Sequence, residues 1–268
     1  MLIDINAYVG HWPFQQLKHN TCAGLLERMN KFGVDISVIS NLNGIFYKNT
    51  QSANEELMQE IRSNKKFHDR FIPFAVINPI YAGWKDDLDT SVKKMGFKGV
   101  RIYPKYHDFD IVDPACIELV KRVRDHGLPV AFNFRMVDSR QRSWMDIDYI
   151  VGTPKPEWNM KSILPIIKAV PDAKFMILNF CNNAALNEEE MALVKKPGVI
   201  IDNSGRAITN MADFINNYGK DKFAFGTHAP ILDYLTAQLR IESMRPNEAD
   251  EATKELLRSG NAKKFLGI

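Results

Sequence analysis

Eight short apolar runs, separated by segments whose apolar residues recur at helical spacing, limit the folds open to this chain. Strands that alternate with helices are typical of a parallel sheet covered by helices. Because eight such units close a barrel of about 250 residues, the 268-residue sequence predicts one α/β domain over 1–268, a single (β/α)8 TIM barrel. The expected strands are Leu2–Gly10, Val34–Ser40, Phe71–Pro79, Lys98–Pro104, Pro129–Phe134, Lys174–Asn179, Gly198–Gly205 and Phe223–Gly226.

Capping residues indicate where helices between these strands begin and end. Thr21 can cap a helix that Gly33 ends, because glycine readily adopts the left-handed conformation found after a helix. Ser52 with Glu55 three residues later predicts a capping box at the start of the next helix.

Charge and cysteine usage limit the partners. The net charge is +3 with scattered Lys and Arg, which indicates neither nucleic acid nor a membrane surface as a partner. We therefore expect a small-molecule substrate, with a homo-oligomer left open. The 3 cysteines form no CxxC pair, which is typical of reduced thiols. Asp4 lies in the first strand, where a signal peptide would be apolar, so a cytoplasmic location is expected.

Barrel enzymes carry their chemistry at the C-terminal ends of the strands. Asn6 and Tyr8 should point together into the barrel mouth, because residues two apart in a strand share a face. The polar residues at the predicted strand ends are Asn6, Tyr8, His11, Arg101, Tyr103, Asn133, Arg135, Asn179, Asp202 and His228. The long connection 135–158 is typical of a binding loop, and we expect it to form part of the pocket.

Four of these strand ends and the C-terminus carry recognisable motifs. They are DINAYVG at 4–10, LPVAFN at 128–133, MILNF at 176–180, FAFGTHAP at 223–230 and GNAKKFLGI at 260–268. In this order they resemble the amidohydrolase-related (type 2) family, whose first strand normally contains Asp-x-His-x-His-x-Gly. The resemblance implies a TIM barrel, a divalent metal held by strand-end histidines, and an activity among hydrolases such as lactonases, with decarboxylases also among the relatives.

The chain departs from that family at every expected metal-binding position. Asn6 and Tyr8 replace the first-strand histidines, Asn133 and Asn179 replace two more, and His228 replaces the eighth-strand aspartate. A carboxamide offers only a neutral carbonyl oxygen, whereas zinc-type metals prefer imidazole, thiolate and carboxylate ligands. We therefore expect no cofactor and no metal at the family's position.

A displaced zinc or manganese site remains open, with His11, Asp202 or His228 as its ligands.

Without a metal, side chains would have to supply acid, base and anion binding. His228 is the candidate general base, Asp202 could orient it, and Tyr8 could donate a proton. Arg101 and Arg135 are candidates for binding a substrate carboxylate. Further contacts to the substrate are expected from Asn6, His11, Tyr103, Asn133 and Asn179.

Three functions follow from these residues. The first is a hydrolase of a small polar or anionic metabolite, of the lactone or sugar-acid type, that works without the usual metal. The second is a non-catalytic descendant that binds a small ligand. The third is a barrel retained only for assembly, which the polar strand ends disfavour.

Overall fold

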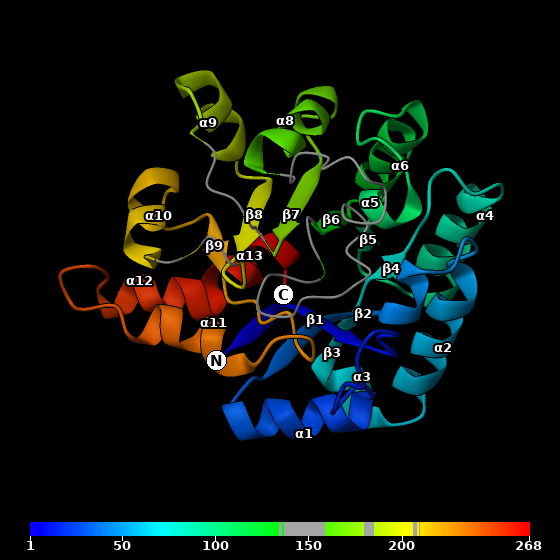
Figure 1. Ribbon diagram of the computed structural model, residues 1–268, viewed down its shortest axis with the longest axis horizontal. Helices are drawn as coiled ribbons and strands as arrows, with labels where there is room; N and C mark the ends of the chain where they lie inside the picture. Colours follow the sequence, from blue (N-terminus) through cyan, green and yellow to red (C-terminus); the bar gives the residue numbers. More distant parts are fainter. Residues whose placement is uncertain (134–135, 137–158, 180–184, 206–207, 209) are drawn as a thin grey trace.

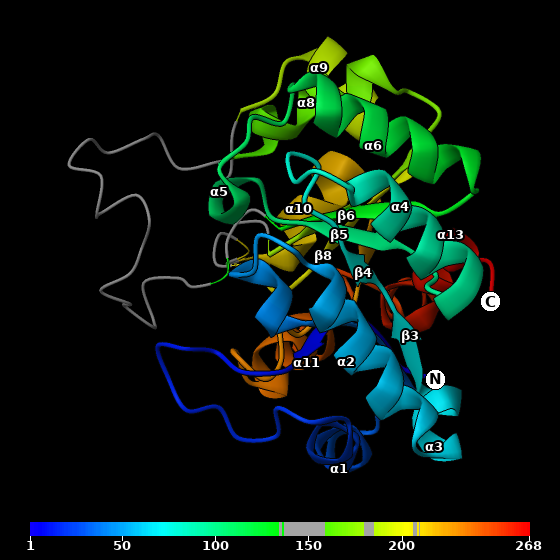
Figure 2. The same ribbon diagram turned by 90° about the vertical axis from the view of Figure 1, so that its right-hand side faces the viewer.

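The computed structural model describes residues 1–133, 136, 159–179, 185–205, 208 and 210–268 (Figure 1). Arg135 and the predicted binding loop, apart from Met136, lie outside the described residues. Figure 1 looks into the end of the barrel at which the strands finish. Figure 2 shows the loop after the first strand on one side of the barrel and the C-terminus on the other.

The eight predicted strands form a closed, parallel barrel. One arc has the order β1-β2-β3 and the other β4-β5-β6-β7-β8-β9. All their pairings are parallel. The strands are β1 (Ile3–Val9), β2 (Ile36–Asn41), β3 (Phe71–Pro73), β4 (Ala75–Val76), β5 (Val100–Ile102), β6 (Pro129–Asn133), β7 (Lys174–Leu178), β8 (Val199–Asp202) and β9 (Phe223–Ala224).

Two junctions complete the barrel. β3 and β4 are halves of one predicted strand, interrupted at Phe74, whose amide donates to the Ile39 carbonyl at 2.8 Å. The last strand meets the first through the Ile5 amide, which donates to the Phe225 carbonyl at 2.9 Å. The fold is therefore the TIM barrel that the sequence predicts.

Helices surround the barrel in Figure 1. They are α1 (Cys22–Phe32), η1 (Leu42–Ile45), α2 (Gln51–Arg62), α3 (Lys65–Arg70), α4 (Trp84–Asp89), η2 (Thr90–Met95), α5 (Pro104–His107), α6 (Pro114–Asp125), α8 (Met160–Ala169), α9 (Glu188–Val194), α10 (Met211–Tyr218), α11 (Tyr234–Glu242), α12 (Glu251–Glu255), η3 (Leu256–Gly260) and α13 (Asn261–Leu266). No helix in the described part of the chain has the length and apolar character needed to cross a membrane.

The helix caps confirm one prediction and correct another. The Thr21 side chain accepts from the Gly24 amide, and Gly33 ends α1 with φ 69°, as predicted. The capping box expected at Ser52 is wrong, because α2 begins earlier, at Gln51. The Asn49 side chain accepts from the Gln51 amide at 3.0 Å and so supports the earlier start.

A β-bulge in β1 separates two layers inside the barrel. Between Asp4 and Ala7, β1 advances one residue more than β2. Such a bulge changes the face on which the following side chains lie. Ile5 consequently packs in an apolar lower layer, whereas Asn6 and Tyr8 both contribute to the mouth. The lower layer consists of Ile3, Ile5, Val38, Phe74, Ala131, Met176, Leu178, Ile200 and Ala224, with Ala262 and Phe265 of the C-terminal segment packed against them.

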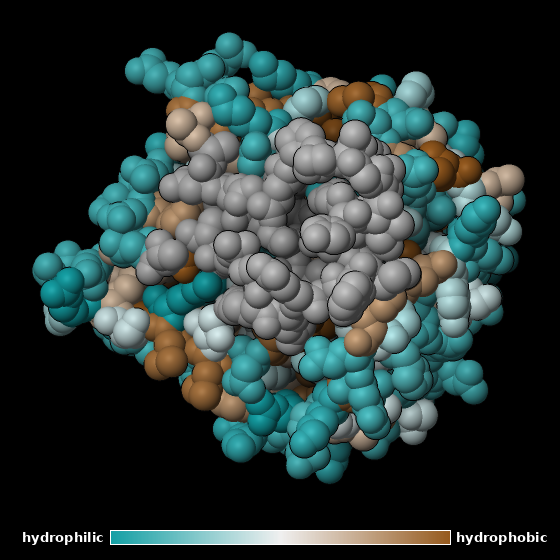
Figure 3. Space-filling model, viewed as in Figure 1, coloured by the Kyte–Doolittle hydropathy of each residue, from teal (hydrophilic) through white to brown (hydrophobic). Residues whose placement is uncertain are grey.

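The surface seen in Figure 3 is largely hydrophilic, with a hydrophobic region over α11. Leu235 and Leu239 of this helix are 50% and 55% exposed. The homo-oligomer that the sequence leaves open stays a prediction.

Candidate functional site at the mouth of the barrel

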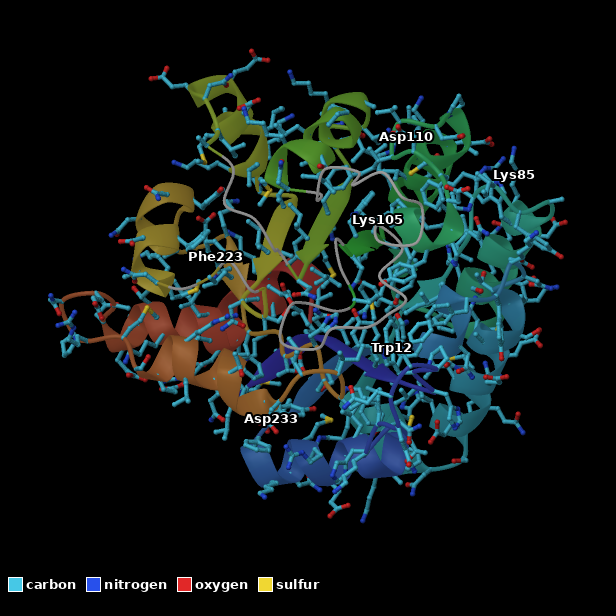
Figure 4. All side chains as sticks on the ribbon, viewed as in Figure 1. Trp12, Lys85, Lys105, Asp110, Phe223 and Asp233 are labelled. Atoms are coloured by element: carbon cyan, nitrogen blue, oxygen red, sulfur yellow. The ribbon has the colours of Figure 1, made fainter. Side chains whose placement is uncertain are left out.

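The mouth contains a cluster of polar side chains that are removed from solvent. They are Asn6, Tyr8, Arg101, Tyr103, Asn133, Asn179, Asp202 and His228, and none is more than 4% exposed. Polar groups buried to this extent are costly unless they are hydrogen-bonded to one another or to a ligand. Figure 4 shows Trp12 and Lys105 near the centre of the view into this mouth, and Lys85 at its periphery.

Asn6 is the centre of the cluster. Its Nδ2 donates to Asp202 Oδ2 at 2.7 Å and lies 3.3 Å from His228 Nδ1. Its Oδ1 accepts from Arg101 Nη1 at 3.4 Å. Since a guanidinium can only donate, Arg101 fixes which side of the amide carries the oxygen. Asn6 therefore bridges Asp202 and His228 and links both to Arg101.

His228 is held at both ring nitrogens. Nε2 lies 2.7 Å from the Met136 carbonyl oxygen, which can only accept, so Nε2 carries the proton. Nδ1 then accepts from the Asn6 amide. His228 also has φ 59°, a left-handed conformation that is uncommon for residues other than glycine and that clusters at functional sites. The sequence pattern did not indicate that Asn6 would lie between Asp202 and its predicted partner His228.

Asp202 is fully buried and accepts three hydrogen bonds. Oδ1 accepts from the backbone amide of Asn179 at 2.8 Å. Oδ2 accepts from Ser204 Oγ at 2.5 Å and from the side-chain amide of Asn6 at 2.7 Å. Burial raises the pKa of Asp202, and the bonds from Ser204 and Asn6 oppose that rise. Sequence reasoning missed Ser204, although it lies two residues after Asp202, the interval at which strand residues share a face.

Tyr8 packs between charged and aromatic partners. The Arg101 guanidinium lies over its ring, 4.4 Å from the centroid, and the His228 ring meets it edge-on at 5.1 Å. Its hydroxyl accepts from Asn133 Nδ2 at 2.6 Å. Burial raises the pKa of Tyr8 well above its ordinary value, so the phenol stays protonated. Tyr8 can therefore donate a proton but does not serve as a base.

Arg101 is the only fully buried guanidinium among the described residues, and it is incompletely paired. Nη1 donates to Asn6 Oδ1 and to the Ala7 carbonyl at 3.3 Å. Nε and Nη2 have no hydrogen-bond partner among the residues that the structure describes. No described carboxylate forms an ion pair with this side chain.

Two neighbouring polar atoms also lack partners within the described chain, the Tyr103 hydroxyl and Asn133 Oδ1. Burial raises the pKa of Tyr103 to about 12, and the Arg101 charge opposes that rise. Tyr103 therefore keeps its proton at neutral pH and can donate it in a hydrogen bond.

Gly226 permits the close approach of the three strands that carry this cluster. A Cβ atom at Gly226 would lie 2.6 Å from Asp202 Cβ and 3.2 Å from Asn6 Cβ. Beneath the cluster, Asp4 accepts from the Thr227 amide at 3.0 Å and from the Thr227 hydroxyl at 2.6 Å. These bonds hold the end of β9 against β1.

His11 lies outside the buried cluster. Its side chain is exposed, and its backbone amide donates to Asn43 Oδ1 at 3.1 Å. The role predicted for His11 in binding substrate stays a prediction, as does that of Arg135, which lies outside the described residues.

Comparison with known proteins places the chain in a family. An amidohydrolase family model matches residues 23–268. The chain belongs to the amidohydrolase family. No curated protein matches the sequence.

Several solved structures share the fold of this chain at low sequence identity, and decarboxylases are among them. A 2,6-dihydroxybenzoate decarboxylase complexed with 2,6-dihydroxybenzoate has TM-score 0.72 and 14% identity, with 100% of this chain and 99% of that chain covered. A 5-carboxyvanillate decarboxylase from Sphingomonas paucimobilis has TM-score 0.70 and 15% identity, with 100% and 99% covered. A dihydroxybenzoic acid decarboxylase from Polaromonas, with bound manganese and 2-nitroresorcinol, has TM-score 0.68 and 14% identity, with 99% and 96% covered.

The described side chains at the mouth do not fit a bound manganese ion. Both Asp202 oxygens and both His228 nitrogens are already engaged in hydrogen bonds, three of them with Asn6 or Ser204. The described residues contain no group of three or more His, Cys, Asp or Glu side chains arranged for a metal.

Proposed function

We propose that this barrel binds a small organic carboxylate at its mouth, with Arg101 as the anion-binding residue. The observation that carries this proposal is the open edge of the Arg101 guanidinium, formed by Nε and Nη2. These two N–H groups point in the same direction and match the two oxygens of a carboxylate.

The burial of Arg101 supports a ligand rather than a structural role. The side chain is 0% exposed, and an unpaired buried charge costs several kcal/mol. The Tyr8 ring and two oxygens offset only part of that cost. A carboxylate on the open edge would supply the missing negative charge.

Tyr103 and Asn133 add a second requirement on the ligand. The Tyr103 hydroxyl can donate to the ligand, and Asn133 Oδ1 can accept from it. A hydroxyl group on the ligand would satisfy Asn133, so a small hydroxy acid fits better than a simple fatty acid. Sugar acids belong to this class, and so does the 2,6-dihydroxybenzoate bound by a neighbouring decarboxylase.

The reaction that we propose is hydrolysis of a lactone or sugar-acid derivative without a metal. His228 would act as the base that takes a proton from the attacking water, and Asp202 is linked to His228 through Asn6. Proton transfer to His228 Nδ1 requires the Asn6 amide to give up its contact with that atom.

The alternative is a non-catalytic barrel that binds the same ligand. It is favoured by the engagement of both His228 nitrogens, which leaves the proposed base without an open lone pair in this arrangement.

Calorimetric titration tests the binding proposal. A panel of hydroxy acids should bind more tightly than the matched primary amides. Arg101→Met should weaken carboxylate binding by at least about tenfold, since hydrogen bonds to charged groups contribute about 1.5–3 kcal/mol. Arg124→Met is the control, because Arg124 pairs with Asp172 on the surface. An equal loss of acid and amide binding in Arg101→Met would refute carboxylate recognition.

Product detection by NMR then separates the two functions. A hydrolase should convert a bound lactone or ester, and His228→Gln should abolish turnover while it retains binding of the acid product. Tight binding without turnover in the wild-type protein would favour the non-catalytic alternative.

A further inference from the structure

Three acceptor atoms converge on a single point at the barrel mouth. Asp202 Oδ2, His228 Nδ1 and Ser204 Oγ lie 2.7, 3.3 and 3.4 Å from the same atom, Asn6 Nδ2. A carboxylate oxygen, an imidazole nitrogen and a hydroxyl oxygen are all able to coordinate a divalent cation. We infer that these three side chains form a latent cation site that is filled by the amide group of Asn6.

The orientation of Asn6 makes its amide a substitute for a cation rather than a ligand. Its oxygen points to Arg101, so its NH2 group faces the three acceptors. An amide nitrogen has no lone pair available for a metal, but its two hydrogens carry positive charge toward the acceptors. Asn6 thus satisfies the buried carboxylate without a metal.

Arg101 adds an electrostatic barrier. Its guanidinium lies on the other side of the Asn6 amide, within 3.4 Å of Oδ1, and is fully buried. A dication beside a buried guanidinium would be repelled strongly, because charges buried in the protein are screened less than charges in bulk water. The two residues together favour a network of hydrogen bonds over a metal.

Asn6→Asp is the direct test, because it changes the electrostatics at this point with almost no change in shape. The new carboxylate would face Asp202, and two buried carboxylates this close require a cation or a proton between them. Chelator-treated protein would be titrated with manganese chloride alone and zinc chloride alone, followed by calorimetry, thermal unfolding and, for manganese, electron paramagnetic resonance.

We expect the wild-type protein to bind neither metal stoichiometrically at this site and to show no shift in Tm when either metal is added. Asn6→Asp should bind one ion per chain and show a rise in Tm with added metal that the wild type lacks. The double variant Asn6→Asp/His228→Ala should lose most of that gain. Asn6→Ala, which opens the position without adding a ligand, should gain less than Asn6→Asp.

Asn133→Asp is the matched control. Asn133 is also a buried asparagine of the mouth, but its Nδ2 faces the Tyr8 hydroxyl and, at 3.4 Å, Met136 Sδ. An equal gain of metal affinity in Asn133→Asp would overturn the inference, since any carboxylate at the mouth would then suffice. A wild-type protein that binds one ion and loses it on Asp202→Asn would also overturn it, as would a folded Asn6→Asp protein without metal affinity.

Discussion

The lower layer of the barrel and its mouth are built from the same strands but differ in chemistry. Below the bulge in β1, the interior consists of apolar side chains such as Ile5, Phe74 and Met176. Above it, residues of equal burial are charged or polar, including Arg101 and Asp202. Removal of apolar surface from water makes burial of the lower layer favourable. Desolvation of the polar side chains at the mouth is unfavourable, and only hydrogen bonds offset it. We infer that the lower layer stabilises the fold and that the mouth is kept for a ligand.

The largest expected effect on stability belongs to the lower layer. Phe74→Ala should lower the free energy of unfolding by about 3–5 kcal/mol, because it removes a fully buried ring and leaves a cavity. Gly99 packs directly against this ring, since a Cβ there would lie 2.4 Å from Phe74 Cζ. Urea unfolding monitored by circular dichroism measures the loss.

Arg101→Met is the matched substitution at the mouth for this measurement. Met removes a charge that is costly to bury, and only the Asn6 and Ala7 oxygens lose a donor, so the free energy of unfolding should change much less than in Phe74→Ala. A loss of stability as large as that of Phe74→Ala would break the distinction between the two layers.

A pH-dependent effect of about 3 kcal/mol is expected from His107 at the mouth. Burial lowers the pKa of His107 to about 4, from an ordinary value of 6.5. Its Nε2 lies 3.0 Å from the Gly44 carbonyl, which ties α5 to η1. The unfolded chain takes up a proton below pH 6.5 while the folded protein does not, so the contribution of His107 is complete above pH 6.5 and is lost as the pH falls toward 4.

Unfolding free energies of the wild type and His107→Gln, measured from pH 7.5 to pH 4, test this linkage. The difference between the two proteins should change by about 3 kcal/mol over that interval. A difference that stays constant with pH would mean that folded His107 takes up a proton as readily as the unfolded chain does.

The smallest expected effect is that of Ser204→Ala, about 1 kcal/mol. The substitution removes the hydroxyl that donates to Asp202 Oδ2 and so raises the pKa of this carboxyl further. NMR titration of a 13C-labelled Asp202 carboxyl would record the shift. An unchanged titration would show that Asn6 and Asn179 alone determine the charge of Asp202.

Most of the fold could be predicted from the sequence, because periodicity and caps are local properties. Val34–Ser40, Pro129–Phe134 and Lys174–Asn179 coincide with β2, β6 and β7 to within two residues. The prediction at Ser52 was wrong because α2 begins at Gln51, whose backbone amide donates to the Asn49 side chain, so that Ser52 lies inside the first turn. A motif shows that a cap is possible but not at which residue the helix begins.

The site was only partly predictable. The rule that strands end at the mouth brought Asn6, Tyr8, Arg101, Asp202 and His228 together correctly. It did not place His11, whose side chain is exposed, and it did not include Ser204. Comparison with the neighbouring decarboxylases gives no support to the lactone part of the predicted substrate class.

The sequence by itself determined that eight parallel strands would gather polar residues at one end of a barrel, because strand periodicity and chain direction dictate which side chains meet there. Only the tertiary structure decided how those residues pair. Hydrogen-bond partners depend on distances between separate strands, and the extra residue in β1 sets them by turning Asn6 toward Asp202 and His228. Within the described residues, the same packing left Nε and Nη2 of Arg101 without a hydrogen-bond partner, since the two oxygens that accept from the guanidinium contact only Nη1.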